Sequence, residues 1–246
     1  MKAIIIAAGL GKRISENFVN TPKSLIKVNG ESIISKQISI FHSNGINEII
    51  IITGPFKEQF SFSNVTYIHD KDYLQHDILG SLMTAKKQLF DDVIITYSDI
   101  LFDDSIIKAV INSKNNIGIV IDLNWKKHYE GRNLHPLHEA ENVLFDNSKK
   151  IIQVKKNIQN SNSIIGEFLG IMKLSNKGCQ KFLEVYEKAL NENKQFHDAK
   201  SLNSAYLTDM IQELIESNVE IGPILINGKW CEIDTIEDLK NAEDIF

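Results

Sequence analysis

Cysteine is scarce in this sequence of 246 residues, which contains only Cys179 and Cys231. The two lie far apart and neither belongs to a Cys-x-x-Cys pair, so the sequence supports neither a zinc site nor a disulfide framework. Isolated cysteines of this kind are typical of proteins from a reducing compartment. We therefore expect a cytoplasmic protein.

Long apolar runs are also missing. No stretch reaches the roughly 18 consecutive apolar residues that a membrane-spanning helix needs. The apolar run near the N-terminus, Ile4 to Ala8, is too short for the core of a signal peptide, and it ends in a glycine-rich segment instead of a small-residue cleavage site. We expect neither a membrane span nor a signal peptide.

An excess of basic residues is absent as well. The chain has 27 Lys and Arg residues against 32 Asp and Glu residues, a net charge of −5. Because nucleic-acid-binding domains are usually basic, nucleic acid is not an expected partner, and local clusters of basic residues must serve small anions. The hydrophobic fraction of 43% and the charged fraction of 24% are ordinary for a globular protein.

The N-terminus does contain a pattern that suits phosphate binding. An apolar run is followed by two glycines and three basic residues: Ile4 to Ala8, then Gly9, Gly11, Lys12, Arg13 and Lys23. The glycines permit positive φ angles and let backbone N–H groups approach a ligand, while the basic side chains offer positive charge to a triphosphate. The pattern therefore predicts a buried first strand that leads into a phosphate-binding loop.

Two common phosphate motifs do not fit this segment. A Walker loop needs glycine and Ser or Thr where this chain has Ile6 and Arg13. The dinucleotide-binding fingerprint needs a third glycine where this chain has Ile14. An NAD-dependent oxidoreductase is thereby disfavoured.

Strands and helices alternate along the first half of the chain. Isoleucine-rich runs predict strands and a period near 3.6 predicts helices. The predicted strands are 4–8, 48–53, 65–68, 93–97 and 117–121, and the predicted helices are 34–41, closed by Asn44-Gly45, then 80–89 and 105–111. This alternation predicts a Rossmann-like α/β fold with a doubly wound, mixed but mostly parallel sheet.

The alternation of predicted strands and helices stops at Asp122, where about twenty residues show no clear hydrophobic period. An irregular connection of that length more often has a function than not. Beyond it we predict further elements: strands at 143–145, 151–155 and 167–174, a helix capped by Ser175, a polar loop at 191–201, a helix from Leu207 to Ile215, a hairpin of 220–226 and 229–233 around Asn227-Gly228, and a last helix from Thr235. We expect one domain, 1–246, with a nucleotide-binding part at about 1–121 and a β-rich acceptor-binding part at about 122–246.

Two aspartates are the candidate metal ligands, because hard cations such as Mg²⁺ prefer carboxylate oxygens. Asp99 follows the predicted strand 93–97, at the carboxyl end where open α/β sheets bind ligands. Asp234 precedes the last predicted helix. Each has a structural alternative: Asp99 can shape the turn into the helix start at Asp103-Asp104-Ser105, and Asp234 with Glu237, or Thr235 with Asp238, can form a capping box.

The motif A-A-G-x-G-x-R followed by P-K-x-L resembles the signature of the nucleotidyltransferases that activate sugar phosphates and phosphorylated alcohols. The C-terminal stretch that contains Trp230, Ile233, Asp234, Thr235, Asp238 and Leu239 is similar to the metal-binding stretch of that family. The resemblance implies that Arg13 and Lys23 are catalytic and hold the triphosphate, that Asp99 and Asp234 hold Mg²⁺, and that the nucleotide is bound by Ala7, Ala8, Gly9, Gly11 and Lys12. The chain departs from the family pattern at Lys12, where Ser or Thr is usual, and at Ser98, where glycine is common.

The segment that contains Gln75, Gly80 and Ser81 is similar to the family's Q-x-x-x-x-G-T/S segment, which reads a pyrimidine edge. A side-chain amide offers a donor and an acceptor together, which suits cytosine or uracil. The alternative is a plain loop in which Gly80-Ser81 begins a helix. Physical argument alone does not choose between CTP and UTP.

The irregular segment after Asp122 is the candidate acceptor site. Arg132 can bind a phosphate with two N–H groups, and Trp125 or Tyr129 can form a wall for a small amine or amide. His135, Lys155 and Glu167 complete the candidate acceptor set. A solvated loop is the alternative, and a transition-metal site built from the histidines with Glu139 and Glu141 matches no defensible ligand spacing.

Over its whole length the chain resembles small cytidylyltransferases of the phosphocholine and aminoethylphosphonate type. The W-x-x-x-Y-x-G-R-x-x-H-P segment and the run from Gly166 to Ser175 are closest to a branch that transfers CMP to L-glutamine phosphate, for the methyl phosphoramidate decoration of capsular polysaccharide. The resemblance implies that CTP and L-glutamine phosphate give CDP-L-glutamine and pyrophosphate, with Mg²⁺ as cofactor. Phosphocholine, 2-aminoethylphosphonate or a sugar 1-phosphate are alternative acceptors, and a regulatory module that binds nucleotide without catalysis is the alternative from another class. The oligomeric state stays open.

Overall fold

The computed structural model describes residues 1–9, 20–159, 163–192 and 195–246. Three residues of the predicted phosphate-binding loop, Gly11, Lys12 and Arg13, lie outside these ranges. Within them, no helix is both long and apolar enough to cross a membrane.

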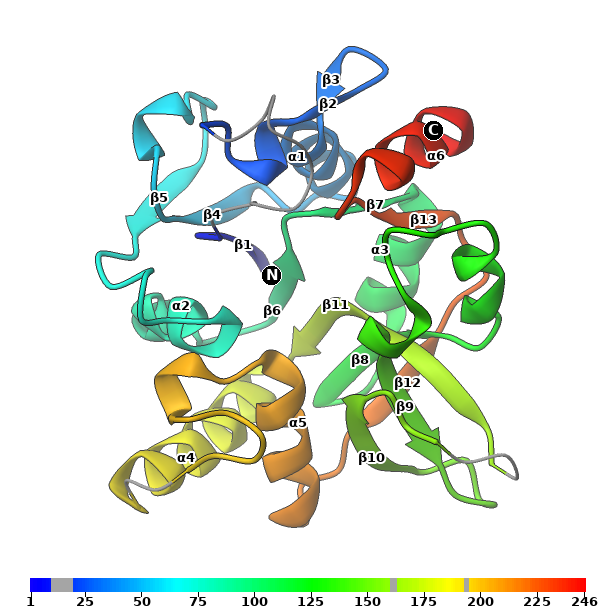
Figure 1. Ribbon diagram of the computed structural model, residues 1–246. Helices are drawn as coiled ribbons and strands as arrows, with labels where there is room; N and C mark the ends of the chain where they lie inside the picture. The colour runs from blue at the N-terminus through cyan, green and yellow to red at the C-terminus, as the bar shows by residue number, and fades with distance from the viewer. Residues whose placement is uncertain (10–19, 160–162, 193–194) are drawn as a thin grey trace.

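A nine-stranded mixed sheet forms the centre of the molecule (Figure 1). Four parallel strands lie side by side in the order β6, β1, β4, β5, with bounds Val93–Tyr97, Lys2–Ala7, Glu48–Thr53 and Thr66–His69. All six residues of β1 and all five of β6 are buried. Their near-continuous isoleucine follows from this position, because central parallel strands are covered on both faces.

One long strand, β11 (Ile165–Leu174), reverses direction and joins the two halves of the sheet. It runs antiparallel to β8 (Ile117–Asp122) on one side, and on the other to β6 and β9 (Glu141–Phe145), which pair with its C-terminal and N-terminal parts respectively. β10 (Ile151–Lys156) pairs with β9, and β12 (Gly222–Leu225) runs parallel to β8. The sheet is therefore mixed, as the sequence predicts.

Helices cover both faces of the sheet, as a doubly wound fold requires. α1 (Ile33–Ser43) packs against α3 (Asp104–Asn112), while α5 (Leu207–Glu216) packs against α2 (Ile78–Thr84) and α4 (Asn176–Glu192), and these three helices lie together at the lower left of Figure 1. The predicted helix 80–89 is corrected: α2 begins and ends earlier, and a 3₁₀ turn at Lys86–Gln88 follows it. Other 3₁₀ turns lie at Lys23–Leu25, Lys57–Gln59, Trp125–Tyr129, Leu137–Glu139 and Leu202–Ser204.

The predicted C-terminal hairpin is wrong. β12 belongs to the main sheet, whereas β13 (Trp230–Glu232) pairs antiparallel with β7 (Ile100–Phe102). The segment between them turns against the start of α3, where Asp103 accepts a hydrogen bond from the Lys229 N–H at 2.8 Å and donates its own N–H to the Lys229 carbonyl at 2.9 Å. These tertiary contacts override the local Asn-Gly turn signal. The last helix, α6 (Ile236–Ile245), follows β13 directly. It lies beside the small two-stranded ribbon of β2 (Lys27–Val28) and β3 (Glu31–Ser32).

Gly170 marks an irregularity in β11. The register of β11 against β8 shifts between Phe168 and Met172, and Gly170 has a φ of +67°. A Cβ atom at Gly170 would lie 2.3 Å from Cδ2 of Tyr97, a residue of the neighbouring strand β6. Position 170 therefore combines a left-handed backbone with a close ring contact, and only glycine meets both conditions.

Replacing Gly170 by alanine is expected to lower the free energy of unfolding by roughly 2–4 kcal/mol, because backbone strain and the clash with Tyr97 add up. Gly131 is the matched control, since it has a φ of +80° but a Cβ atom there would meet nothing within 4 Å. Gly131→Ala should cost about 1 kcal/mol from backbone strain alone. Urea unfolding of both variants measures the difference, and equal losses would contradict the steric account.

Candidate active site

Three segments that are distant in the sequence bring Lys23, Asp99 and Asp234 together. Lys23 begins a 3₁₀ turn, Asp99 lies between β6 and β7, and Asp234 lies between β13 and α6. The pairing of β7 with β13 aligns the two aspartate segments, and the N–H of Ile233 donates to the carbonyl of Asp99 at 2.9 Å. The two predicted metal ligands thus meet at the carboxyl end of β6, where open α/β sheets bind ligands.

Lys23 lies between the two aspartates. Its Nζ atom is 2.6 Å from Oδ2 of Asp99 and also contacts Oδ1 of Asp234. Burial alone would lower the pKa of Lys23, but the Asp99 and Asp234 carboxylates outweigh it and raise the pKa. Lys23 is therefore a fixed cation that balances part of the charge of both carboxylates.

Neither aspartate is needed as a helix cap. Thr235 caps α6 and forms a capping box with Asp238, whose carboxylate accepts from the N–H groups of Asp234 and Thr235 at 3.0 and 2.8 Å. Asp103 caps α3, accepting from the Ser105 N–H. Of the structural alternatives, the Thr235–Asp238 capping box is present, whereas Asp234 does not cap α6 with Glu237, and the metal-binding role of Asp99 and Asp234 stays a prediction.

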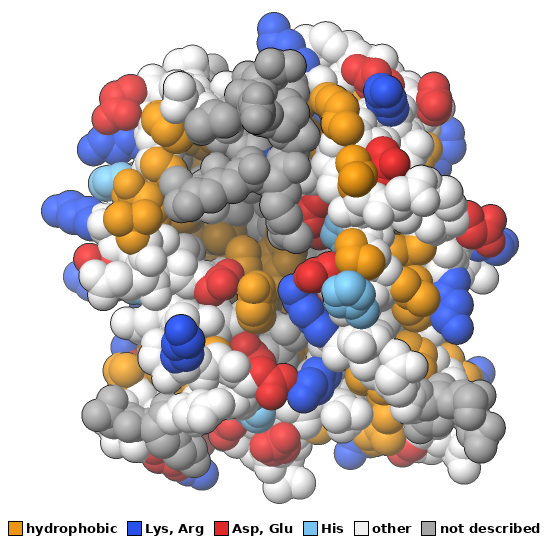
Figure 2. All heavy atoms as spheres, viewed as in Figure 1, with side chains coloured by type: hydrophobic (Ala, Val, Ile, Leu, Met, Phe, Trp, Pro, Cys, Tyr) orange, Lys and Arg blue, Asp and Glu red, His pale blue; other side chains and the backbone are white. Residues whose placement is uncertain are grey.

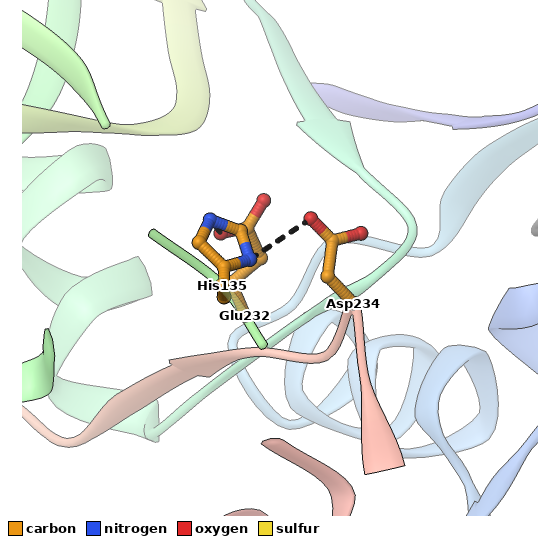
Figure 3. Close-up of side chains that lie close together, drawn as sticks. All are labelled: His135, Glu232 and Asp234. Carbon is orange, nitrogen blue, oxygen red and sulfur yellow. Dashed lines mark ion pairs between the residues drawn. The ribbon is translucent and has the colours of Figure 1, made fainter. Parts of the chain in front are cut away.

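His135 and Glu232 stand beside Asp234, and Figure 3 shows the His135 ring directed at the Asp234 carboxylate. Nδ1 of His135 is 3.3 Å from Oδ2 of Asp234, and its Nε2 is 3.6 Å from Oε2 of Glu232. One ligand atom from each of the three residues lies within 4.8 Å of the others. Next to this cluster, Oδ1 of Asp99 is buried and finds no hydrogen-bond partner within the described part of the chain. An orphaned carboxylate oxygen among further carboxylates fits a hard divalent cation such as Mg²⁺.

The loop that carries His135 is fastened to the start of α6. Nε of Arg132 is 2.7 Å from Oδ1 of Asp238, and the N–H groups of Asn133 and Leu134 donate to Oε2 of Glu237 at 2.8 and 2.9 Å. The Arg132 side chain is only 5% exposed. In this structure Arg132 therefore positions the loop, and its role as a phosphate ligand stays a prediction.

A cavity of about 320 Å³ opens next to Asp99 and Asp234. Asp99, Asp234, His135 and Glu232 contribute to its lining, together with charged residues from β9, β10 and β11. In Figure 2 acidic and basic side chains gather around a hollow in the viewed face. Electrostatics in this region are unusual, because burial raises the pKa of Glu141 to about 8 and raises the pKa of Glu167 well above its ordinary value.

Two predicted acceptor residues are buried apart from the cavity. Trp125 and Tyr129 pack with Ala140 in a small hydrophobic cluster, and neither is among the described residues that line the cavity. Nε1 of Trp125 donates to the Ile165 carbonyl at 3.0 Å, and the Tyr129 hydroxyl donates to Glu167. Glu167 and His135, by contrast, do line the cavity, as the candidate acceptor set requires.

The lysine that lines the cavity is Lys156, the neighbour of the predicted Lys155. In the β9–β10 register Lys156 is opposite Glu141 and Lys155 is opposite Asn142, so the two lysines lie on opposite faces. Lys155 is exposed and pairs with Asp198 at 2.8 Å. Sequence analysis missed Lys156 and Glu232. Strand alternation offered a signal for each, because side chains two positions apart point to the same side of an extended chain. Lys156 follows Val154 by two positions, and Glu232 precedes Asp234 by two positions.

The predicted nucleotide-binding residues lie near the end of β1 and around α2. Ala7 and Ala8 are buried and Gly9 is exposed at the carboxyl end of β1. Gln75 is exposed, the Ser81 hydroxyl donates to Oδ2 of Asp70 at 2.8 Å, and a Cβ atom at Gly80 would meet the Asn203 carbonyl at 2.3 Å. Asp77 and Ile78 of this segment line the cavity, whereas base recognition by Gln75, Gly80 and Ser81 stays a prediction.

The fold and this carboxylate-rich site define a nucleotidyltransferase of the Rossmann-like α/β class. Residues 3–153 match the MobA-like NTP transferase domain, and the chain belongs to that family.

Several known proteins are similar over long stretches. CTP:phosphoglutamine cytidylyltransferase of Campylobacter jejuni is 29% identical over 253 residues, which cover 98% of each chain. Choline-phosphate cytidylyltransferase of Streptococcus pneumoniae is 40% identical over 106 residues, 42% of this chain and 46% of that protein. Among solved structures, the CTP:phosphocholine cytidylyltransferase of Streptococcus pneumoniae superposes with a TM-score of 0.73 at 23% identity, covering 99% of this chain and 98% of the other. That superposition confirms the fold.

Proposed function

We propose that this protein transfers CMP from CTP to L-glutamine phosphate and releases pyrophosphate, which makes CDP-L-glutamine for the phosphoramidate decoration of a capsular polysaccharide. The observation that carries the reaction class is the contact of Lys23 with Asp99 and Asp234, two aspartates that line one cavity. The acceptor is supported by the phosphoglutamine enzyme, which is 29% identical over 98% of both chains, whereas choline-phosphate and 2-aminoethylphosphonate relatives match 42% and 34% of this chain, and a GlmU relative that matches 98% of it does so over 53% of its own length.

The reaction is a displacement at the α-phosphorus of CTP. An oxygen of the acceptor phosphate forms the new P–O bond, the bond between the α-phosphorus and the bridging oxygen breaks, and the electron pair leaves with pyrophosphate. A terminal phosphoryl group carries negative oxygens at neutral pH, as a phosphate monoester does with its second pKa near 6, so it is already a nucleophile and needs no general base. The protein's contribution is thus positioning and charge stabilisation.

Lys23 would supply positive charge to the triphosphate, and Asp99 and Asp234 would hold Mg²⁺. Bound there, Mg²⁺ would neutralise phosphate charge that builds up as pyrophosphate leaves. Arg13 is proposed as a second cation on the triphosphate from its sequence motif, since it lies outside the described residues. His135, held 3.3 Å from Asp234, would orient that carboxylate.

Pyrophosphate release tests the proposal when each of CTP, UTP, GTP, ATP and dTTP is combined with L-glutamine phosphate, phosphocholine, 2-aminoethylphosphonate and a set of sugar 1-phosphates. We expect turnover with CTP and L-glutamine phosphate in the presence of Mg²⁺. Turnover with another acceptor would keep the reaction class and reject the acceptor. CTP binding without turnover of any acceptor would favour the regulatory module instead.

A further inference from the structure

Away from Asp99 and Asp234, the cavity is lined by more acidic than basic side chains. Asp77, Glu139, Glu141 and Glu167 contribute carboxylates to it, and Lys156 is the one lysine or arginine among its described lining residues. A ligand group that carries positive charge would complement this acidic lining.

Glu167 gives the sharpest sign of a missing partner. The residue is 4% exposed, and its Oε1 atom accepts a hydrogen bond from the Tyr129 hydroxyl. Its Oε2 atom is buried and has no hydrogen-bond partner among the residues that the structure describes. Buried carboxylate oxygens without a donor are rare and costly, so an N–H group of a ligand is the expected complement.

Lys156 and Glu141 stand opposite one another on neighbouring strands, which places both charges on one face. The Tyr97 hydroxyl donates to Oε2 of Glu141 at 3.3 Å, and Nζ of Lys156 is 3.1 Å from Oε2 of Glu139. A lysine ammonium has three N–H donors, so Lys156 can keep this contact and still bind a carboxylate of a ligand. Both kinds of charge are therefore presented to the cavity by adjacent strands.

We propose that this part of the cavity binds an α-amino acid group of the acceptor, with Glu141 and Glu167 holding its ammonium and Lys156 holding its carboxylate. The inference rests on the proposed function and specifies what the acceptor must carry besides its phosphate. Burial raises the pKa of both Glu141 and Glu167, and the positive charges of Lys156 and Arg132 offset this effect only in part.

This arrangement discriminates among the candidate acceptors by their chemistry. A quaternary ammonium such as that of phosphocholine has no N–H to donate to Oε2 of Glu167, and it brings no carboxylate to Lys156. 2-Aminoethylphosphonate has the ammonium but lacks a carboxylate. A sugar 1-phosphate offers neither charge at this position. L-glutamine phosphate carries both groups on one carbon atom.

Three acceptor probes test the inference: L-glutamine phosphate, the same compound with hydrogen in place of the α-amino group, and the same compound with hydrogen in place of the α-carboxylate. For the wild type we expect kcat/KM to fall between about 10- and 100-fold when either group is lost, as for hydrogen bonds to charged groups. Glu167→Gln should lose the preference for the amino group but keep the preference for the carboxylate. Lys156→Met should do the reverse, and Lys150→Met, at an exposed lysine just before β10, should keep both preferences.

Each other result has a defined meaning. Equal losses for all three probes in Glu167→Gln would show a merely structural role and overturn the inference. If Glu167→Gln does not fold, the same comparison of the three probes is made with Glu141→Gln. Loss of the carboxylate preference in Lys155→Met instead of Lys156→Met would overturn the assignment of the lysine. Turnover of L-glutamine phosphate with no preference for either group would overturn the inference alone. Turnover restricted to phosphocholine or 2-aminoethylphosphonate would overturn the proposed acceptor as well.

Discussion

Asparagine in place of Asp234 is expected to lower kcat for pyrophosphate release by about 10³-fold, the scale found when a charge-stabilising group is removed from an active site. The substitution keeps the shape of the side chain but removes the negative charge that contacts Lys23 and His135. It would also weaken the set of carboxylates that we assign to Mg²⁺. We therefore expect the Mg²⁺ concentration for half-maximal activity to rise at the same time.

The fold should survive this change, because Thr235 and Asp238 cap α6 and Asp234 does not. Lys23 also keeps Asp99 as a partner at 2.6 Å. Steady-state kinetics with an Mg²⁺ titration, together with thermal unfolding, separate the two effects. Asp244→Asn is the control, since Asp244 is an exposed aspartate of α6 and should behave as the wild type does. Activity of Asp234→Asn within tenfold of the wild type, with an unchanged Mg²⁺ dependence, would rule out the assigned role.

Methionine in place of Lys23 is expected to have two opposite effects. It removes the cation that lies between Asp99 and Asp234, so Mg²⁺ should bind to the free protein about tenfold more tightly, because one competing charge near a partly hydrated site is worth at least ~1.4 kcal/mol. The same substitution removes positive charge from the triphosphate, so kcat/KM for CTP should fall by about 10²- to 10³-fold. Tighter metal binding and slower catalysis are an unusual combination that a simple loss of folding does not produce.

Calorimetric titration with Mg²⁺ alone measures the first effect, and pyrophosphate release measures the second. Lys27→Met is the matched control, because Lys27 is an exposed lysine of β2 four positions further along the chain. Weaker Mg²⁺ binding by Lys23→Met than by this control would mean that Lys23 supports the metal site and does not compete with it.

The parts of the site that the sequence predicts are those fixed by strand order. Asp99 could be located because it follows β6, an apolar run whose period and neighbours indicate a central parallel strand. The C-terminal motif identified Asp234, but its place beside Asp99 depends on the pairing of β13 with β7, and the sequence predicts a hairpin there instead. An Asn-Gly pair is a local signal, and contacts with Asp103 decide the outcome.

The acceptor side of the cavity was harder to predict, because it depends on which face of a short strand each side chain takes. A shift of one residue separates Lys155 from Lys156, and the signal from Val154 is weakened because an irregularity between Ile151 and Gln153 interrupts the alternation of this short strand. Trp125 and Tyr129 were expected as a wall for the acceptor because they are aromatic and lie in an irregular segment. They are instead the core of a small cluster with Ala140, which stabilises the loop that carries His135.

The most direct test of the central claim is the identity of the product. Purified protein is incubated with CTP, L-glutamine phosphate and Mg²⁺, and the nucleotide products are identified by mass spectrometry while pyrophosphate is counted. The account predicts CDP-L-glutamine and pyrophosphate in equal amounts, with neither formed when the acceptor is left out. Pyrophosphate or CMP formed at the same rate with and without acceptor, or bound CTP that stays intact with every acceptor tested, would contradict it.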